Sequence, residues 1–499
     1  MDEPCVIENV CFVGSDKPVD IAVRHGRIAS VRPSERPTDA ASKIWVIPGL
    51  WDCHTHFTQW SYTLGRLDLI DARSASEALD MLRRHLEERR ESGALDPNQY
   101  VVGMRFRHSL WSDDAQPTLA AIDAVAGDQP VALSSADMHC GWVNSAAARK
   151  LGVDVDESGL VGELEWFDAY CKLDKGPGAA NELMHLLRNA ERDAASKGVV
   201  GVRDYEMAEN IDTWISRFSQ GLDGLRVEAG IYPERLRQAI DDGWHTGDEL
   251  PGSHGLGHVG AMKMISDGSL NTRSAYCSMP YSGIRPETYG TLSYAPEQIE
   301  SYMRLAVEHG FDIACHAIGD EANTIVLDCA ERTHAHGSIE HAQMLKECDI
   351  LRLAQLGLVA SIQPQHAMDD RDVIARFWGT PAGIPYAFNS LHKAGTKLLM
   401  GSDAPVAPLD PWMAISAAVF GTESSDREPF QPEQCLDFET ALASSTAVGR
   451  LALRDADAAD LVLLDCDPSI IDSPEAMRAM PEHVLGTMLA GRWTYQQAE

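Results

Sequence analysis

Eight short apolar runs constrain what this chain of 499 residues can fold into, because longer segments with helical spacing separate them. Buried strands that alternate with helices form parallel sheets. Eight such units close into a (β/α)8 TIM-like barrel. The pattern therefore predicts an α/β fold with barrel strands at residues 45–51, 198–202, 225–231, 259–265, 311–315, 338–339, 358–362 and 397–400.

The two ends of the chain have a different pattern. Apolar and polar residues alternate there, as they do in half-buried strands. We therefore expect residues 1–47 and 445–499 to join into one small β-sandwich domain that brackets the barrel at 48–444.

An insertion is expected after the first barrel strand. Two further apolar runs, 100–104 and 130–133, lie between the first and second barrel strands, and they predict an α/β insertion at about 57–197. Helical spacing of apolar residues is clearest in four segments. They are residues 76–92, 181–197, 296–309 and 321–334.

The balance of charge excludes several classes of partner. Lys and Arg number 42 against 75 Asp and Glu, which gives a net charge of −33, and the carboxylates are dispersed along the chain. A surface this acidic repels phosphate backbones and anionic lipids. We expect a small-molecule partner, and neither nucleic acid nor a membrane.

Cysteine usage and the first residues predict a cytoplasmic protein. The 11 cysteines include no C-x-x-C pair, which argues against a disulfide framework and a zinc ribbon. The acidic first residues differ from a signal peptide, and no apolar stretch approaches the roughly 18 residues of a membrane span. If the chain forms an oligomer, we expect a homodimer, because this is the commonest form among soluble oligomers.

The strongest local motif is an apolar strand that ends in His54-Thr55-His56. Residues two apart on a strand share one face, so both imidazoles can point at one metal ion. Asp52 has the same parity and can orient a ligand. The chain's other His-x-His, His334-Ala335-His336, follows a predicted helix, and we expect it to be a solvated surface pair.

Three later strands end in further candidate ligands. His316 and His341 end the fifth and sixth predicted strands, and Asp403 follows the last one. The carboxyl ends of barrel strands form the face on which active sites are built. These side chains are therefore expected to converge with His54 and His56.

Lys263 interrupts the apolar run of the fourth predicted strand, so its amine should point into the barrel. Burying an ammonium is costly, and losing the proton or gaining a partner relieves the cost. A neutral amine can add carbon dioxide and become a carbamate, an oxygen ligand able to bridge two metal ions. The alternative is a lysine paired with a charged neighbour on the sheet.

These motifs, in this order, resemble the amidohydrolase superfamily of metal-dependent hydrolases, and the resemblance covers nearly the whole chain. Within it, they are similar to the amidohydrolase family 3 branch that contains N-substituted formamide deformylases. The segments that carry the resemblance are Pro48 to His56, Lys263 to Leu270, His316 to Asp320 and Gly401 to Pro405.

The resemblance implies a ligand set for two ions, with zinc expected and iron, manganese or cobalt as alternatives. His54 and His56 would bind the more buried ion, and His316 and His341 the more exposed one. A carboxylated Lys263 would bridge the two ions, although a site with one metal stays open.

The resemblance also implies catalytic and substrate-binding residues. Asp403 would bind metal and act as general base and then acid, and His316 would take part in catalysis. The segment from Asp137 to Asn144 resembles a substrate-contacting segment of the same branch. Substrate-binding candidates there and in loops near the site are His139, Trp142, Arg273 and His366. Cys53 and Cys315 alternate with the ligands and are expected to be packing thiols.

The function implied is hydrolysis of a C–N bond other than a peptide bond, in an amide or N-substituted formamide, by metal-activated water. Two alternatives remain. One is a deaminase of a ring amidine with a single metal ion, which usually needs an H-x-x-E acid that is not evident after Val259. The other is a non-catalytic barrel that binds a ligand.

Overall fold

A computed structural model describes residues 5–35, 43–91, 93, 95–108, 111–112, 116–135, 140–173, 179–270 and 272–497. The chain divides into two compact units, the first made of residues 1–60 and 190–499 and the second of residues 61–189. It passes between them within α1 (Phe57–Leu64) and α6 (Ala179–Ser196). Over the described ranges, none of the helices has both the length and the apolar character needed to cross a bilayer.

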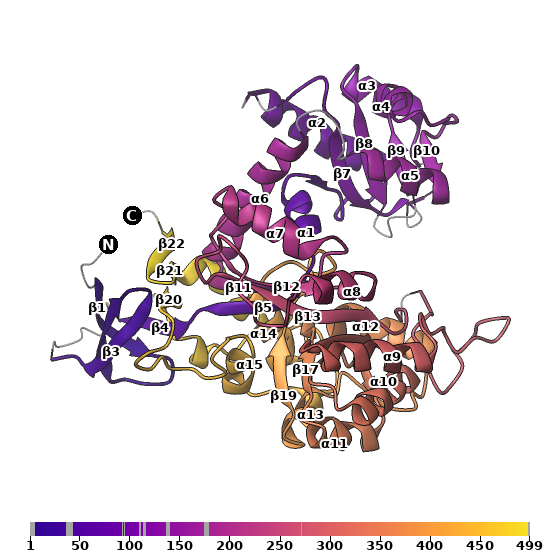
Figure 1. Cartoon of the computed structure of the whole chain (residues 1–499). Helices are drawn as coiled ribbons and strands as arrows, with labels where there is room; N and C mark the ends of the chain where they lie inside the picture. Colours follow the sequence, from indigo (N-terminus) through magenta and orange to yellow (C-terminus); the bar gives the residue numbers. More distant parts are fainter. Residues whose placement is uncertain are drawn as a thin grey trace. The chain divides into compact units, whose positions relative to one another are not determined.

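The first unit contains the predicted (β/α)8 barrel, an eight-stranded parallel sheet surrounded by helices (Figure 1). Strands buried on both faces read as continuous apolar runs, and Val199, Val200 and Val202 are all buried in one strand. In sheet order the strands are β5 (Leu50–Thr55), β11 (Val199–Asp204), β12 (Arg226–Ile231), β13 (Gly257–Ile265), β14 (Ile313–Ala317), β15 (Gly337–His341), β17 (Val359–Ile362) and β19 (Lys397–Met400).

Helices follow the barrel strands, and they include two of those predicted from apolar spacing. The helices of this unit are α7 (Asn210–Ser219), α8 (Pro233–Asp241), α9 (Pro296–Glu308), α10 (Asp320–Thr333), α11 (Glu347–Gln355), α12 (Pro364–Phe377), α13 (Phe388–Lys393), α14 (Pro411–Phe420), α15 (Phe438–Ser444) and α16 (Pro474–Arg478). His334 and His336 are exposed just after α10 ends, which confirms the predicted surface pair.

The barrel closes where the segment after β19 meets β5. The Asp403 N–H donates to the His54 carbonyl at 2.7 Å, and the His56 N–H donates to the Ala404 carbonyl at 2.8 Å. Gly401 permits this approach, because a Cβ there would lie 2.6 Å from the backbone nitrogen of His54. Backbone hydrogen bonds therefore hold Asp403 beside the two histidines.

The first predicted barrel strand is two strands, which corrects the prediction. β4 (Ile44–Pro48) belongs to another sheet, and only β5 enters the barrel. The hydrogen-bonding partner of the backbone changes at Gly49. The Gly49 N–H donates to the backbone carbonyl of Asp460, whereas the Leu50 N–H donates to that of Gly198. A Cβ on Gly49 would lie 2.4 Å from the Val200 side chain, so glycine is needed at this crossing.

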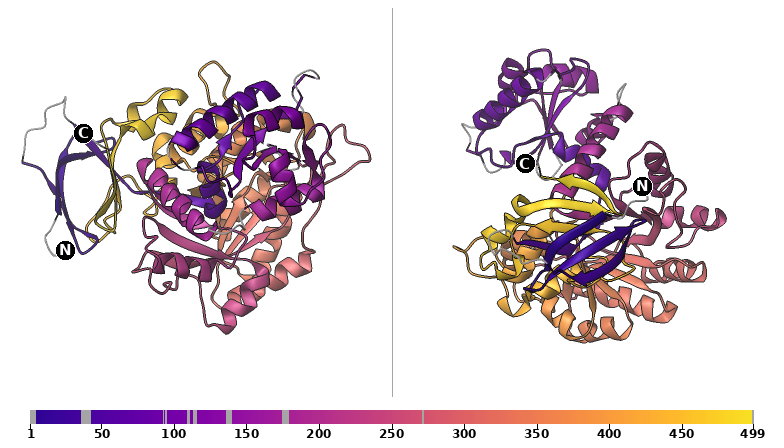
Figure 2. Two further views of the ribbon diagram at one scale, coloured as in Figure 1. Left: turned by 90° about the horizontal axis from the view of Figure 1, so that it is seen from above. Right: turned by 90° about the vertical axis from the view of Figure 1, so that its left-hand side faces the viewer.

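Strands from both ends of the chain form one seven-stranded sheet, and Figure 2 shows them together. Ile21 and Ile28 share a small apolar core with Leu461 and Met488, so this sheet has a core of its own. Each of its strands is hydrogen-bonded to the next, so the strands form one continuous sheet. In sheet order they are β22 (Arg492–Gln496), β21 (Val484–Leu489), β20 (Leu461–Leu464), β4, β1 (Cys5–Phe12), β2 (Pro18–Arg24) and β3 (Arg27–Pro33).

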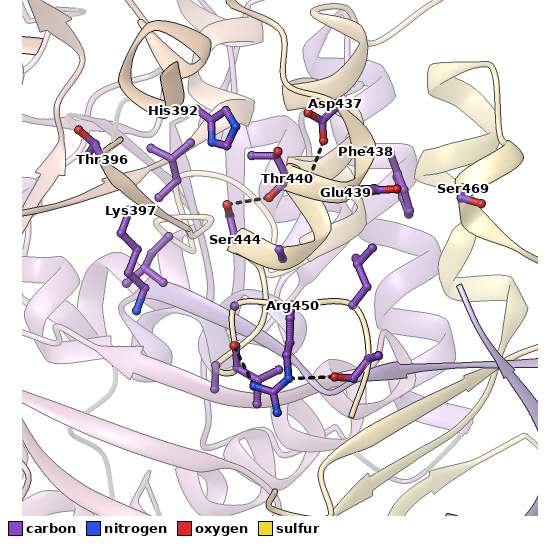
Figure 3. Close-up of a pocket in the computed structure, with 18 of the residues that line it drawn as sticks. His392, Thr396, Lys397, Asp437, Phe438, Glu439, Thr440, Ser444, Arg450 and Ser469 are labelled. Carbon is purple, nitrogen blue, oxygen red and sulfur yellow. Dashed lines mark hydrogen bonds between the residues drawn. The ribbon is translucent and has the colours of Figure 1, made fainter. Parts of the chain in front are cut away.

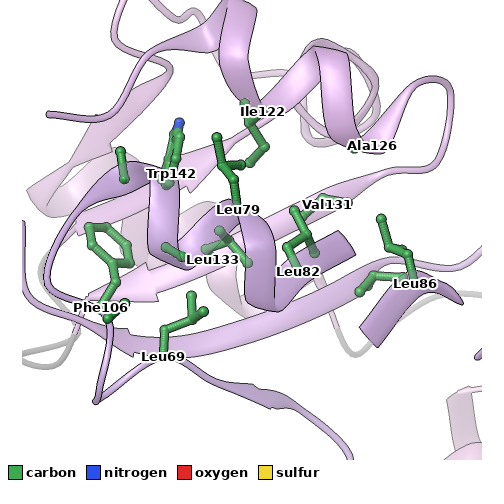
Figure 4. Close-up of a cluster of buried hydrophobic side chains, with 14 of the residues drawn as sticks. Leu69, Leu79, Leu82, Leu86, Phe106, Ile122, Ala126, Val131, Leu133 and Trp142 are labelled. Atoms are coloured by element: carbon green, nitrogen blue, oxygen red, sulfur yellow. The ribbon is translucent and has the colours of Figure 1, made fainter. Parts of the chain in front are cut away.

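The second unit is an α/β insertion with its own five-stranded sheet. Figure 4 shows part of its apolar core, to which Leu82, Phe106 and Trp142 contribute. The extra runs predicted from the sequence are β7 (Val101–Phe106) and β8 (Val131–Ser135). The other elements are β6 (Leu67–Asp68), α2 (Ala75–Glu91), α3 (Leu119–Ala126), β9 (Cys140–Val143), α4 (Ser145–Leu151), β10 (Leu160–Gly162) and α5 (Glu163–Leu173).

Candidate metal centre

His54, at the end of β5, is held in one orientation. Its imidazole is almost completely buried, and its Nδ1 lies 2.6 Å from Oε2 of Glu340. An ionised carboxylate only accepts hydrogen bonds, so Nδ1 carries the proton and donates it. The lone pair of Nε2 is then free to bind a metal ion.

Asp403 lies between the two histidines of the His-x-His motif. Its Oδ1 is 3.5 Å from Nε2 of His54 and 3.4 Å from Nε2 of His56. These separations exceed a normal N–H···O hydrogen bond. They match the roughly 3.3–3.4 Å between neighbouring ligand atoms of a tetrahedral zinc ion. Oδ1 of Asp403 therefore lies at the spacing of two ligands of one ion from each of these imidazole nitrogens.

His341 completes a compact group with His54 and Asp403, whose ligand atoms all lie within 4.8 Å of one another. Nδ1 of His341 is buried and, in the described part of the chain, has no hydrogen-bond partner. Burial, together with His316 and His54, holds the pKa of His341 well below its usual value. A neutral imidazole with an unsatisfied nitrogen is what a metal ligand requires.

The backbone is unusual at two of these residues. His341 has a φ of 69° and Asp403 a φ of 59°, in the left-handed region that few residues other than glycine adopt. Such conformations persist where surrounding contacts impose them, often at functional sites. Here they turn both side chains toward His54.

Lys263 of β13 points into the barrel, as predicted. Its Nζ lies 3.4 Å from Nε2 of His54 and 5.1 Å from the ring centroid of Tyr205. No carboxylate of the described residues forms an ion pair with it. Burial lowers the pKa of the amine, more than Glu340 and Asp403 raise it. The alternative, an ion pair between Lys263 and a charged neighbour on the sheet, is therefore not found among the described residues.

His316 of β14 lies beside the group. Its ring centroid is 4.6 Å from that of His341, and its Nε2 lies 3.3 Å from both Oδ1 of Asp267 and the carbonyl of Gly268. Asp267 also accepts the backbone N–H groups of Ile318 and Gly319, at 3.1 and 2.9 Å. Asp267 therefore links the loop after β13 to the loop that follows His316.

His366, for which substrate contact stays a prediction, lies against Asp403. It stands in the first turn of α12, and its Nε2 is 3.3 Å from Oδ2 of Asp403. Burial would lower the pKa of His366, but the Asp403 carboxylate outweighs burial and raises it. His366 thus faces the second oxygen of the carboxylate whose first oxygen faces His54 and His56.

The other three substrate candidates have different outcomes. Arg273 is exposed, and its guanidinium lies 5.5 Å from the ring centroid of Phe377. Trp142 is fully buried in the core of the second unit, where its Nε1 donates to the Thr118 carbonyl at 3.3 Å. This is the position of a packing residue. His139 lies outside the described residues, and its role stays a prediction.

Two carboxylates escaped the sequence prediction, Glu340 and Asp267. Glu340 precedes His341, and strict alternation along β15 would turn one of them away from the site. The positive φ of His341 breaks the alternation, so both side chains reach the centre. Asp52 behaves as expected, because its Oδ1 accepts the N–H groups of His54 and Ser402 at 3.2 and 2.9 Å.

Replacing Glu340 by glutamine is expected to weaken metal binding by about 10–100-fold, since partners that orient a ligand typically contribute that much. The amide can still occupy the space, but it loses the negative charge that makes His54 a better ligand. Competition with a chromophoric chelator measures the affinity. Glu228→Gln is the control, because that carboxylate pairs with Arg203 at 2.7 Å. Equal affinities of Glu340→Gln and the wild type would refute this role.

A large groove lies elsewhere on the first unit (Figure 3). Its volume is about 1000 Å3, and its lining includes Lys397, Thr440 and Arg450. Lys397 begins β19, whereas Asp403 follows the other end of that strand. Barrel active sites form at the carboxyl ends of the strands. The groove is therefore separate from the candidate metal centre.

Known proteins match this chain over most of its length. A sequence model of the amidohydrolase family matches residues 40–495. The chain belongs to the amidohydrolase family. This confirms the family predicted from the motifs, and it makes the protein a hydrolase of the amidohydrolase superfamily. Family membership suggests a divalent metal, and the described residues offer a His/Asp site for one.

Two curated proteins illustrate the range of relatives of this amidohydrolase. It is 25% identical to a putative amidohydrolase, YtcJ, of Bacillus subtilis, over 91% of this chain and 89% of that one. It is also 25% identical to the N-substituted formamide deformylase of Arthrobacter pascens, over 90% of each chain.

Solved structures support the fold. An uncharacterized metal-dependent hydrolase from Pyrococcus horikoshii superposes with a TM-score of 0.76 at 23% identity, over 94% of this chain and 99% of that one. The similarity therefore extends over both units of the chain.

Proposed function

We propose that this amidohydrolase is a metal-dependent enzyme that cleaves a non-peptide C–N bond in a small amide or N-substituted formamide. The observation that carries the proposal is the position of Asp403, with one oxygen facing His54 and His56 and the other facing His366. The relative named as an N-substituted formamide deformylase supports the choice of bond.

Two divalent ions, zinc first and iron, manganese or cobalt next, are proposed to bind here. His54, His56 and Asp403 would hold one ion, and His316 and His341 the other. A bound ion would supply a Lewis acid that polarises a carbonyl and makes water more acidic. The side chains of His56, His316 and Asp403 are 13–17% exposed, so solvent reaches this side of the group.

Asp403 is suited to act as the general base. Burial alone would raise its pKa, but His54, His366 and His56 hold it well below the usual value. The carboxylate is therefore ionised at neutral pH and can accept a proton from water as the water oxygen forms a bond to the carbonyl carbon, before the C–N bond breaks. The same oxygen can then return that proton to the leaving amine, so the carboxylate is regenerated.

We also propose that Lys263 becomes a carbamate that bridges the two ions. Burial lowers the pKa of the amine, and a neutral Nζ can form a bond to the carbon of carbon dioxide with loss of one proton. The product carries two oxygens beyond Nζ, which lies 3.4 Å from Nε2 of His54. A longer oxygen ligand can reach ions on both sides.

A hydrolysis screen tests the proposed function. Protein stripped of metal and reloaded with zinc, manganese or cobalt is incubated with N-substituted formamides, amides, esters and ring amidines. We expect the metal-loaded protein to release amine from formamides or amides, and the metal-free protein to release none. Ammonia release confined to ring amidines would show a deaminase instead. If the protein binds metal but hydrolyses none of these compounds, the result would favour a ligand-binding barrel.

A further inference from the structure

A second group of candidate metal-binding side chains lies far along the chain from the barrel candidates, just beyond the ends of β20 and β21 in the seven-stranded sheet. We call Asp465, Cys466, Met480 and His483 the thiol cluster. The candidate ligand atoms of Asp465, Cys466 and His483 all lie within 4.8 Å of one another. Sγ of Cys466 is also 3.7 Å from Sδ of Met480. The cluster thus offers sulfur, nitrogen and oxygen at one place.

The backbone fixes the cluster. β20 pairs with β21 up to Leu464 and Val484, and the next residues are Asp465 and His483. The Asp465 N–H donates to the His483 carbonyl at 3.2 Å, so the two residues stay together beyond the ladder. Their side chains are also joined, with Nδ1 of His483 2.8 Å from Oδ1 of Asp465. Residues on paired strand ends give a metal site that needs little reorganisation.

Burial is graded across the cluster. Met480 is fully buried and Cys466 partly buried, whereas the side chains of His483 and Asp465 are 42% and 48% exposed. An ion can therefore enter from solvent on the side of the imidazole and carboxylate and meet the sulfur atoms beneath them.

The donor set selects the kind of ion. Calcium and magnesium prefer oxygen ligands alone, whereas thiolate and thioether ligands favour zinc and copper(I). We propose that the thiol cluster binds one thiophilic metal ion, zinc or copper(I), at a site separate from the barrel centre.

The local charge is favourable to a cation. Burial, with Asp465 and Asp467 nearby, raises the pKa of the Cys466 thiol to about 11. Binding of an ion to Sγ would release the thiol proton to solvent. The carboxylates that disfavour the thiolate attract the incoming cation.

Cobalt(II) is the probe, because thiolate ligation gives a near-ultraviolet charge-transfer band that histidine and carboxylate ligands do not. The barrel ligands proposed above include no cysteine, so the band reports on the thiol cluster even when both sites fill. Titration of the reduced full-length chain is expected to give the band with about one equivalent of thiolate-bound cobalt. Addition of zinc or copper(I) is expected to abolish it, and the ion effective at the lower concentration is the preferred one.

Cys466→Ser is expected to remove the band, and His483→Ala to weaken binding at least tenfold. Cys348→Ser, at an exposed cysteine outside the thiol cluster, is expected to retain it. Circular dichroism checks that each variant is folded. Absence of the band in the wild type, or its persistence in Cys466→Ser, would overturn the proposal. Failure of both zinc and copper(I) to displace cobalt would also overturn it.

Discussion

Asparagine in place of Asp403 is expected to lower kcat for amide hydrolysis by about 10²–10⁴-fold, the usual contribution of a general base. The variant keeps the size of the side chain but loses its charge and basicity. Asparagine also tolerates the left-handed conformation that this position adopts, with its φ of 59°. The loss should therefore report on chemistry and not on misfolding.

The assay compares Asp403→Asn with the wild type at saturating metal, because the carboxylate is also a proposed ligand. Asp312→Asn is the control, since it makes the same change beside the opposite end of a barrel strand. A kcat within threefold of the wild type for Asp403→Asn would rule out the general-base role.

Alanine in place of His54 is expected to lower kcat/KM by more than about 10³-fold, because a bound metal supplies several kcal/mol of transition-state stabilisation. Metal content per chain should fall with it. The change also leaves Oε2 of Glu340 buried without its imidazole donor, which costs about 1–3 kcal/mol of stability, although Ser338 still donates to Oε1. Metal content by plasma mass spectrometry and thermal unfolding are therefore measured together.

His56→Ala separates loss of metal from loss of fold, because its side chain is 17% exposed and has no buried carboxylate partner on Nδ1 among the described residues. It should lose metal and activity with a smaller change in stability. His334→Ala, in the exposed His-x-His, is the control and should behave as the wild type. Full metal content in both His54→Ala and His56→Ala would contradict the proposed ligand set.

Much of the fold is legible in the sequence because parallel barrel strands are buried on both faces. Their apolar runs stand out, and seven of the eight predicted strands fall directly on barrel strands. The first run misleads, because only Gly49 separates β4 from β5 and the apolar residues continue across it to Trp51. Only the change of hydrogen-bond partners at Gly49 separates them, and that depends on residues far along the chain.

Strand parity predicts that the candidate ligands His54 and His56 share one face and that Lys263 points into the barrel, and the structure has both histidines facing Asp403 and the amine beside His54. Parity fails where the backbone leaves the extended conformation, as it does at His341, and Glu340 is missed for that reason. The position of His366 beside Asp403 could not be predicted from the sequence for a different reason. It depends on how α12 begins after β17, and no periodicity reports where the first turn of a helix points.

The most direct test of the proposed metal centre is an anomalous difference map, recorded at the absorption edge of the bound ion from crystals of the metal-loaded full chain. The map shows whether His54, His56 and Asp403 bind metal. We predict a peak about 2.0–2.2 Å from Nε2 of both His54 and His56 and from an oxygen of Asp403. A second peak beside His316 and His341, with extra density on Nζ of Lys263, is also expected. A single peak with unmodified Lys263 would contradict the binuclear proposal alone. Absence of any peak at Asp403, in crystals of protein that hydrolyses its amide, would contradict the metal centre itself.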